Sequence, residues 1–149
     1  MDKQFAAIKK EYAAFEKELA DNFKFVVRDT AKGIWGAANP DNVFALFKVI
    51  GLDKKKSFMD IGCGDGRVVL IASLFTRAFG IEFDKALVDK GNEIQQKLGL
   101  KAELICDDFY KHDFSKYDVL FINPDTGFYN GLEDKLLKEM KGTLYVYND

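Results

Sequence analysis

Residues 58–67 read FMDIGCGDGR, a short apolar run that passes directly into glycines at positions 62, 64 and 66. An apolar run of this length beside a glycine-rich turn is typical of a buried strand. Glycines let the backbone turn sharply and approach a ligand, and the N–H groups at the start of a following helix favour a polar or negative group. The segment therefore predicts a strand, a ligand-binding turn and a helix that begins at Arg67.

The glycine spacing separates this turn from the dinucleotide-binding fingerprint G-x-G-x-x-G. Arg67 stands where the third glycine of that fingerprint would be. Asp60 lies at the end of the strand, where a carboxylate would repel a pyrophosphate but would attract a cationic ligand. Both features argue against an NAD-binding domain.

Strand-like and helix-like segments alternate through the rest of the chain. Strands separated by helices are typical of right-handed βαβ units and a parallel sheet. We therefore predict a doubly wound α/β fold with a mostly parallel sheet. The predicted strands cover residues 57–61, 78–82, 102–106, 117–122 and 143–147, and the helices between them cover residues 67–76, 85–98 and 132–141.

Two further helices are expected before the first strand of the sheet. Residues 2–21 carry one apolar stripe at spacings of three and four, which predicts a helix packed on the domain. Residues 32–39 are interpreted as a loop, after which Asn39 caps a helix that starts at Pro40 and runs to Gly51. We divide the chain into an N-terminal helical extension, residues 1–36, and an α/β domain, residues 37–149.

Composition and charge narrow the class of protein. The 149 residues are 48% hydrophobic and carry a formal net charge of −2. This near balance of charges argues against a protein that coats nucleic acid through its overall charge. It is compatible with a local basic patch. The run Lys54–Lys56 favours a solvated loop over such a patch.

Several classes of site and location are not expected. No apolar run approaches the roughly 20 residues that span a bilayer, and the polar N-terminus does not resemble a signal peptide. Cys63 and Cys106 form no CxxC pair, and His112 is the sole histidine, so we expect neither a metal site nor a Ser-His-Asp triad. We predict a cytoplasmic protein in a reducing compartment, in which both cysteines pack as small apolar residues.

Acidic residues follow the second and third predicted strands. Glu82, in GIEFD at 80–84, is placed to accept the two hydroxyls of an adenosine ribose. In CDDF at 106–109, Asp107 or Asp108 is placed to accept the adenine amino group, and Phe109 to stack or pack beside the ring. The carboxyl ends of these strands meet at one sheet edge, where ligands of open α/β sheets bind.

With DVLFINPD at 118–125, these motifs resemble the first four motifs of the class I, Rossmann-like methyltransferases that depend on S-adenosylmethionine. The chain is most similar to the small archaeal protein-lysine methyltransferases, from about Ala37 to the C-terminus. The resemblance implies S-adenosylmethionine as cofactor and S-adenosylhomocysteine as product, with the glycine turn at the methionine part, Glu82 at the ribose and Asp108 at the adenine. The expected cofactor-binding residues are Asp60, Gly62, Cys63, Gly64, Glu82, Phe83, Asp108, Phe109 and Asn123.

The segment after the fourth strand departs from the lysine-methylating relatives. Asn123-Pro124-Asp125-Thr126 replaces their mainly apolar residues and looks closer to the D/N-P-P-Y/F motif of enzymes that methylate nucleobases or side-chain amides. Asp125 stands in place of the second proline. We expect Asn123 and Asp125 to be catalytic, Asn123 by accepting a hydrogen bond from the attacking nitrogen and Asp125 by orienting a lysine ammonium or helping to remove its proton.

Three functions stay open at this point: methylation of protein lysine, methylation of a nucleobase or small amine, and a non-catalytic cofactor-binding module. Class I enzymes usually end in an antiparallel hairpin after the fifth strand, for which this sequence has no residues after Asp149. The predicted edge strand at 144–147 is therefore a candidate for pairing with another chain, as in a homodimer.

Overall fold

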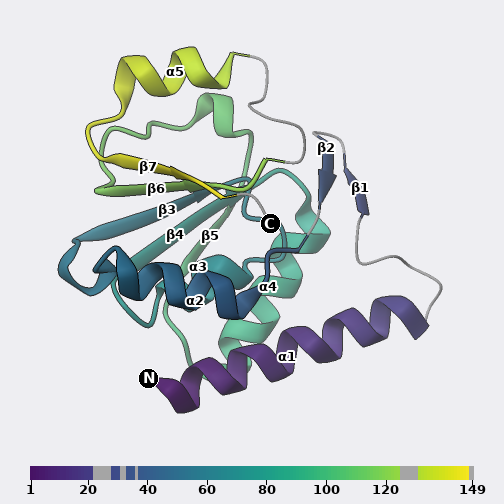
Figure 1. Cartoon of the computed structure of the whole chain (residues 1–149). Helices are drawn as coiled ribbons and strands as arrows, with labels where there is room; N and C mark the ends of the chain where they lie inside the picture. The colour runs from purple at the N-terminus through teal and green to yellow at the C-terminus, as the bar shows by residue number, and fades with distance from the viewer. Residues whose placement is uncertain (22–27, 31–32, 36, 125–130, 148–149) are drawn as a thin grey trace.

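The computed structural model describes residues 1–21, 28–30, 33–35, 37–124 and 131–147. Its centre is a five-stranded parallel sheet with the strand order β5-β4-β3-β6-β7 (Figure 1). The doubly wound α/β fold is thus confirmed. The strands are β3 (Ser57–Ile61), β4 (Arg77–Glu82), β5 (Glu103–Cys106), β6 (Val119–Ile122) and β7 (Thr143–Val146).

The strand order reverses direction at β3. The chain moves outward from β3 through β4 to β5, then returns to the other side of β3 with β6 and β7. Ile61 is in register with Ile81 of β4 and with Ile122 of β6. Gly62 and Asn123, which follow their strands, and Glu82, which ends β4, therefore lie at the same edge, at the topological switch point where ligands of such sheets bind.

Helices cover both faces of the sheet and make two separate cores (Figure 1). Alternate strand residues point to opposite faces, so Phe58 and Phe121 join one cluster while Met59 and Ile122 join the other. The first cluster lies under α1 (Asp2–Asp21), α2 (Pro40–Val49), α3 (Arg67–Ala72) and α4 (Lys85–Leu98), and the second lies under α5 (Leu132–Glu139).

The two helices that precede the sheet form as their sequences predict. The buried residues of α1 are those of its apolar stripe: Phe5, Ile8, Tyr12, Phe15 and Leu19. Asn39 caps α2, because its side-chain oxygen accepts the backbone N–H groups of Asp41 at 2.9 Å and Asn42 at 3.2 Å. None of the helices in the described part of the chain combines the length and the apolar character needed to cross a membrane.

Two expectations about local structure were wrong. Gly33–Trp35, placed in a loop, is a strand (β2) that pairs antiparallel with β1 (Arg28–Thr30), and runs of three residues are too short to reveal a period of two. The helix predicted for 67–76 ends at Ala72. The N–H groups of Leu74 and Phe75 bond three residues back, so tighter turns replace the helix there.

Candidate functional site

The turn after β3 depends on the backbone freedom of glycine. Gly62, Gly64 and Gly66 have φ angles of 74°, 56° and 82°, in the left-handed region that other residues rarely adopt. The N–H groups of Gly62 and Cys63 both donate to the carbonyl of Ile81, at 2.8 and 2.9 Å. These bonds fold the turn across the end of β4, so the backbone between β3 and α3 lies at the carboxyl edge of the sheet.

Two glycines outside the turn let it pack this closely, and neither was expected to do so. A Cβ atom on Gly80 would lie 2.5 Å from Val69 Cγ2 and 2.8 Å from Cys63 Sγ. A Cβ atom on Gly91 would lie 2.7 Å from the carbonyl oxygen of Asp65. A glycine inside a strand or helix pattern is the signal that marks such close approaches.

Glu82 braces the glycine turn from the end of β4. Its carboxylate is buried, with the residue 9% exposed. One oxygen accepts the N–H of Gly64 at 3.0 Å, and the other accepts the N–H of Asp84 at 2.8 Å. Each carboxylate oxygen has a second acceptor position, so Glu82 keeps the capacity to accept hydroxyl groups of a ligand.

Asp60 is a buried carboxyl group at the same edge, and only 3% of the residue is exposed. Burial raises the pKa of Asp60 well above its usual value, and the nearby carboxylates of Glu82 and Asp65 raise it further. Among the described residues, no cation lowers this pKa. A ligand with a positive charge would stabilise the ionised form of Asp60 and would itself be held.

The two cysteines differ in their surroundings. Cys63 is buried in the core below the turn, where burial and the Asp60 and Glu82 carboxylates raise the pKa of its thiol. Cys106 is exposed instead of packed, so the expectation for this residue was wrong. It ends the edge strand β5, and its Sγ lies 3.7 Å from the carbonyl oxygen of Phe83.

The residues expected at the adenine end are brought to this edge but differ in exposure. Asp108 caps the short helix η2 (Phe109–Lys111), because its side chain accepts the N–H of Tyr110 at 3.0 Å. Phe109 is 6% exposed and belongs to the second core. Phe83 is 43% exposed. Phe109 therefore supports the strand end from below, whereas Phe83 presents an apolar surface at it.

A buried charged cluster ties the far side of the glycine turn to α1. Arg67, the first residue of α3, donates from Nη2 to Asp65 at 2.8 Å and from Nη1 to Glu16 at 2.6 Å. The Tyr12 hydroxyl donates to the carbonyl oxygen of Asp65 at 2.8 Å, and the guanidinium carbon lies 4.9 Å from the Tyr12 ring centroid. Burial lowers the pKa of Arg67, but the carboxylates of Asp65 and Glu16 together outweigh this effect and raise the pKa, so Arg67 stays charged. We call these four residues the α1 clamp.

Tyr12 and Glu16 were not expected as neighbours of the site. Tyr12 belongs to the apolar stripe expected within residues 2–21, but such a stripe does not show which residues it will contact. The only available signal was a tyrosine in an otherwise apolar stripe, since a buried hydroxyl requires a hydrogen-bond partner.

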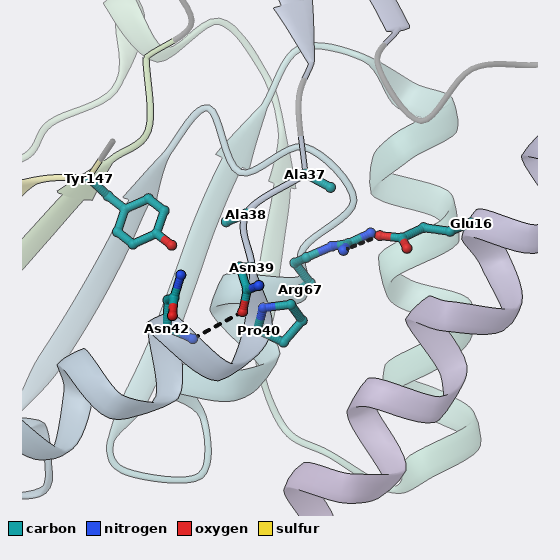
Figure 2. A pocket seen from close by; sticks show the side chains of 8 residues that line it. All are labelled: Glu16, Ala37, Ala38, Asn39, Pro40, Asn42, Arg67 and Tyr147. Atoms are coloured by element: carbon teal, nitrogen blue, oxygen red, sulfur yellow. Dashed lines mark hydrogen bonds and ion pairs between the residues drawn. The ribbon is translucent and has the colours of Figure 1, made fainter. Parts of the chain in front are cut away.

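A cavity of about 680 Å³ opens beside the α1 clamp (Figure 2). Arg67 and Glu16 lie on one side of it, Tyr147 on the other, and the start of α2 between them. The N–H of Tyr147 donates to the carbonyl of Ile122 at 2.8 Å, so this wall adjoins the residue before Asn123. The lining residues are Glu16, Ala37, Ala38, Asn39, Pro40, Asn42, Arg67 and Tyr147.

Of the two expected catalytic residues, the structure describes one. Asn123 is half-buried directly after β6, and Pro124 behind it is buried. Asp125 lies outside the described residues, as does Thr126. The structure therefore places Asn123 at the switch point, at the same edge as Gly62 and Glu82.

Comparison with known proteins identifies relatives of this arrangement. Residues 20–143 match the model of a family described as histone methylation protein DOT1. No curated protein sequence matches the chain.

Solved structures share the fold. An RNA methyltransferase from Salinibacter ruber, in complex with S-adenosylhomocysteine, is 22% identical with a TM-score of 0.68, over 76% of this chain and 78% of that one. A protein-L-isoaspartate O-methyltransferase is 21% identical with a TM-score of 0.61, over 82% of this chain and 41% of that one.

A third structure, an S-adenosylmethionine-dependent methyltransferase from Thiobacillus denitrificans in complex with S-adenosylhomocysteine, is 17% identical with a TM-score of 0.62. The match covers 72% of this chain and 48% of that one, so the chain spans less than half the length of these last two proteins. The likenesses confirm the Rossmann-like methyltransferase fold.

Proposed function

Because this chain belongs to the family of the histone methylation protein DOT1, and is therefore a methyltransferase, we propose that it transfers a methyl group from S-adenosylmethionine to lysine of a protein. The observation that carries the proposal is the coincidence, at one sheet edge, of a glycine turn with the buried carboxylates of Asp60 and Glu82. The narrower likeness to archaeal protein-lysine methyltransferases remains part of this proposal.

The residues at this edge fit the proposed cofactor. S-adenosylmethionine supplies an electrophilic methyl group on a positively charged sulfur, and its methionine part carries an ammonium group. Asp60 would be the counter-charge for the cationic end, beside Gly62, Cys63 and Gly64. Glu82 would accept the ribose hydroxyls, and Asp108 would accept the adenine amino group with the exposed Phe83 beside it and Phe109 below.

The acceptor would approach from the cavity, whose Tyr147 wall is hydrogen-bonded to Ile122, the residue before Asn123. Methyl transfer requires the attacking nitrogen, the methyl carbon and the sulfur to lie in line, so the protein acts mainly by orientation. Asn123 would accept a hydrogen bond from the attacking nitrogen and direct its lone pair at the methyl group. Asp125 would orient the ammonium or help to remove its proton.

The character of the cavity supports a lysine side chain as the acceptor. Ala37, Ala38 and Pro40 offer apolar walls for an aliphatic stem, and the two carboxylates and one guanidinium of the α1 clamp leave a net charge of −1 that attracts a cation. Arg67, the one cation among the described lining residues, is neutralised by Asp65 and Glu16. A site for a nucleic-acid substrate would instead need unpaired cations.

A second candidate is methylation of a nucleobase or another small amine. Asn123-Pro124 favours it, since this pair resembles the motif of enzymes that act on such nitrogens. The alternative of a non-catalytic module is disfavoured by membership of a methyltransferase family.

Transfer of radiolabelled methyl from S-adenosylmethionine into host extract tests the proposal. We expect label that is lost on protease treatment and retained after nuclease treatment. If nuclease treatment removes the label, the methyl acceptor is nucleic acid and not protein lysine. The Asn123→Ala, Asp125→Ala double variant should lose transfer by about 100-fold while still binding S-adenosylhomocysteine; full activity of this variant would refute the roles given to both residues.

Three further predictions belong to the same proposal. Residues 1–36 form an extension to a cofactor-binding domain at 37–149. The protein is cytoplasmic, in keeping with the free thiols of Cys63 and Cys106. A homodimer forms along β7, the last strand of the described sheet. Light scattering on the purified chain would test the dimer, which a monomer at all concentrations would exclude.

A further inference from the structure

Exposed cations gather at the edge of the sheet opposite the candidate site. Each of the five parallel strands begins at this edge, and each is preceded or started by a basic residue. We call these residues the basic edge: Lys54, Lys55 and Lys56 before β3, Arg77 at the start of β4, Lys101 before β5, Lys116 before β6 and Lys141 before β7. All seven are exposed.

Hydrogen bonds join the central loops of the basic edge. The Thr76 hydroxyl donates to the carbonyl of Lys55 at 2.6 Å, which ties the loop before β4 to the loop before β3. The N–H of Lys56 donates to the Asp118 carboxylate at 2.8 Å, which ties the loop before β3 to the loop before β6. The cations of three loops therefore share one surface.

Ring contacts join the same surface on the α5 side of the sheet. The Arg77 guanidinium lies 5.5 Å from the centroid of Phe79, whose ring is 5.3 Å from that of Tyr117. The ammonium of Lys116 lies 5.6 Å from the Tyr117 ring. Arg77 and Lys116 are thus the two ends of one stack of side chains.

The cations of the basic edge form no ion pairs among the described residues, whereas several cations of the helices do. Lys85, Lys97 and Lys135 each lie within 3.0 Å of a carboxylate oxygen. Four exposed carboxylates belong to the loops and strand starts of the basic edge: Asp53, Glu103, Asp113 and Asp118. The seven cations outnumber them, so this edge is positive on a chain whose net charge is −2.

Stabilisation of helix C-termini accounts for only part of this distribution, since just Lys101 and Lys141 lie within two residues of an α-helix cap, at Gly99 and Met140. All the helices of the βαβ units end at this edge, and cations in the last turn of a helix are favourable, but that effect falls off within one turn. Lys54–Lys56 lie beyond the α2 cap at Ile50, and Arg77 lies beyond the α3 cap at Ser73. Lys116 follows no α-helix directly.

We propose that the basic edge binds the phosphate backbone of nucleic acid. Strands of a sheet lie about 4.8 Å apart, so five strands give a positive strip about 20 Å wide. A duplex carries one charge per roughly 1.7 Å of its axis, so a strip of this width faces several phosphates at once. Six of the seven cations are lysines, which suit contacts to phosphate that do not depend on base sequence.

An acidic protein surface fits the basic edge less well. Protein interfaces are anchored by buried aromatic and apolar side chains as well as by charge. The exposed large apolar residues of the described chain are Met1, Val49, Phe83, Leu137 and Val146, and none of them lies in the loops that carry the seven cations.

This inference is independent of the proposed methyl acceptor. A strand of five residues is about 16 Å long, so nucleic acid on the basic edge leaves the cavity and the glycine turn at the other edge accessible. The edge would hold the enzyme on nucleic acid while its site acts on another molecule.

Fluorescence anisotropy with a labelled 20-base-pair duplex of random sequence, at 50 to 200 mM salt, tests the proposal. The full chain is compared with the Lys55→Glu, Lys56→Glu, Lys101→Glu variant and with a matched control, Lys3→Glu, Lys10→Glu, Lys17→Glu, which makes the same charge change on the exposed side of α1. Binding of S-adenosylhomocysteine should be equal in all three proteins, which shows that each is folded.

We expect the unaltered chain to bind the duplex with a slope of log K against log salt on the order of −4 to −6. The variant at the basic edge should bind at least tenfold more weakly, and the control should stay within about threefold. Absence of binding at 50 mM salt, or an equal loss in both variants, would overturn the proposal. If polyglutamate binds more tightly than the duplex, the partner of the basic edge is an acidic protein and not nucleic acid.

Discussion

The two edges of the parallel sheet differ in the burial of their charged groups. At the carboxyl edge, Asp60, Asp65 and Glu82 are buried, and Arg67 is enclosed by carboxylates and the Tyr12 ring. At the amino edge, where the strands begin, the seven cations of the basic edge are exposed and form no ion pairs among the described residues. Buried charge is costly unless it is compensated, so each group there has a fixed geometry. Exposed charge is screened by salt, so it acts collectively and at longer range.

The largest effect should come from an acid at the carboxyl edge. Glu82→Ala leaves the N–H groups of Gly64 and Asp84 without their acceptor and removes the proposed ribose partner. We expect about a 100-fold loss of affinity for S-adenosylhomocysteine in calorimetric titration, since the hydrogen bonds that Glu82 would accept from the two ribose hydroxyls are worth about 1–3 kcal/mol each. Glu103→Ala, an acid at the amino edge, is the matched control and should bind normally. Equal affinity of the two variants for S-adenosylhomocysteine would show that the acids of the two edges do not differ in cofactor binding.

Asp60 should make stability depend on pH. Its pKa is raised in the folded protein, so the folded state favours protonated Asp60. The stabilisation from this preference is fully present below the unfolded pKa of about 3.9. It is lost as pH rises through the folded pKa, where the buried carboxyl group must ionise. Without cofactor, Asp60→Asn should therefore melt several degrees higher than the unaltered chain at neutral pH and equally at pH 4.

Thermal unfolding between pH 4 and pH 9 measures this difference. Asp53→Asn at the amino edge serves as the control and should melt with the unaltered chain throughout, because its carboxylate is exposed. A higher melting temperature of Asp60→Asn that persists unchanged at pH 4 would show that ionisation of Asp60 is not the cause.

A smaller effect is expected at the α1 clamp. Tyr12→Phe removes the buried donor to the carbonyl oxygen of Asp65, which should lower the free energy of unfolding by about 1 kcal/mol. Tyr145→Phe on β7 loses the same hydroxyl from a half-buried ring and should be neutral. Urea unfolding of both variants makes the comparison. Unchanged stability of Tyr12→Phe would mean that α1 contributes only apolar packing.

The smallest effect should follow from a single change at the amino edge. Lys56→Ala removes one of seven cations, so the salt slope of duplex binding should become shallower by about 1, with cofactor affinity unchanged. Lys10→Ala on α1 should leave the slope as it is. A slope that does not change with Lys56→Ala would remove this residue from the proposed contact.

Much of the carboxyl edge could be predicted because its signals are local. The glycine turn, the acids after β4 and β5, and Asn123 after β6 are each marked within a few residues, and parallel strands necessarily bring their ends to one edge. The same reasoning failed for Gly33–Trp35, because a strand of three residues has no measurable period. It failed for Cys106, because its position on an edge strand follows from the order of the strands.

By itself, the sequence determined the parallel α/β fold, the conformation of the glycine turn and the residues that meet at the carboxyl edge, since these depend on backbone freedom and short-range periodicity. Only the tertiary structure decided that Tyr12 and Glu16 hold that turn through Asp65 and Arg67. It also showed that Lys54–Lys56, interpreted alone as a solvated loop, share a surface with cations from four other loops. Contacts between residues more than 50 positions apart depend on how helices pack and strands are ordered, and no local pattern records them.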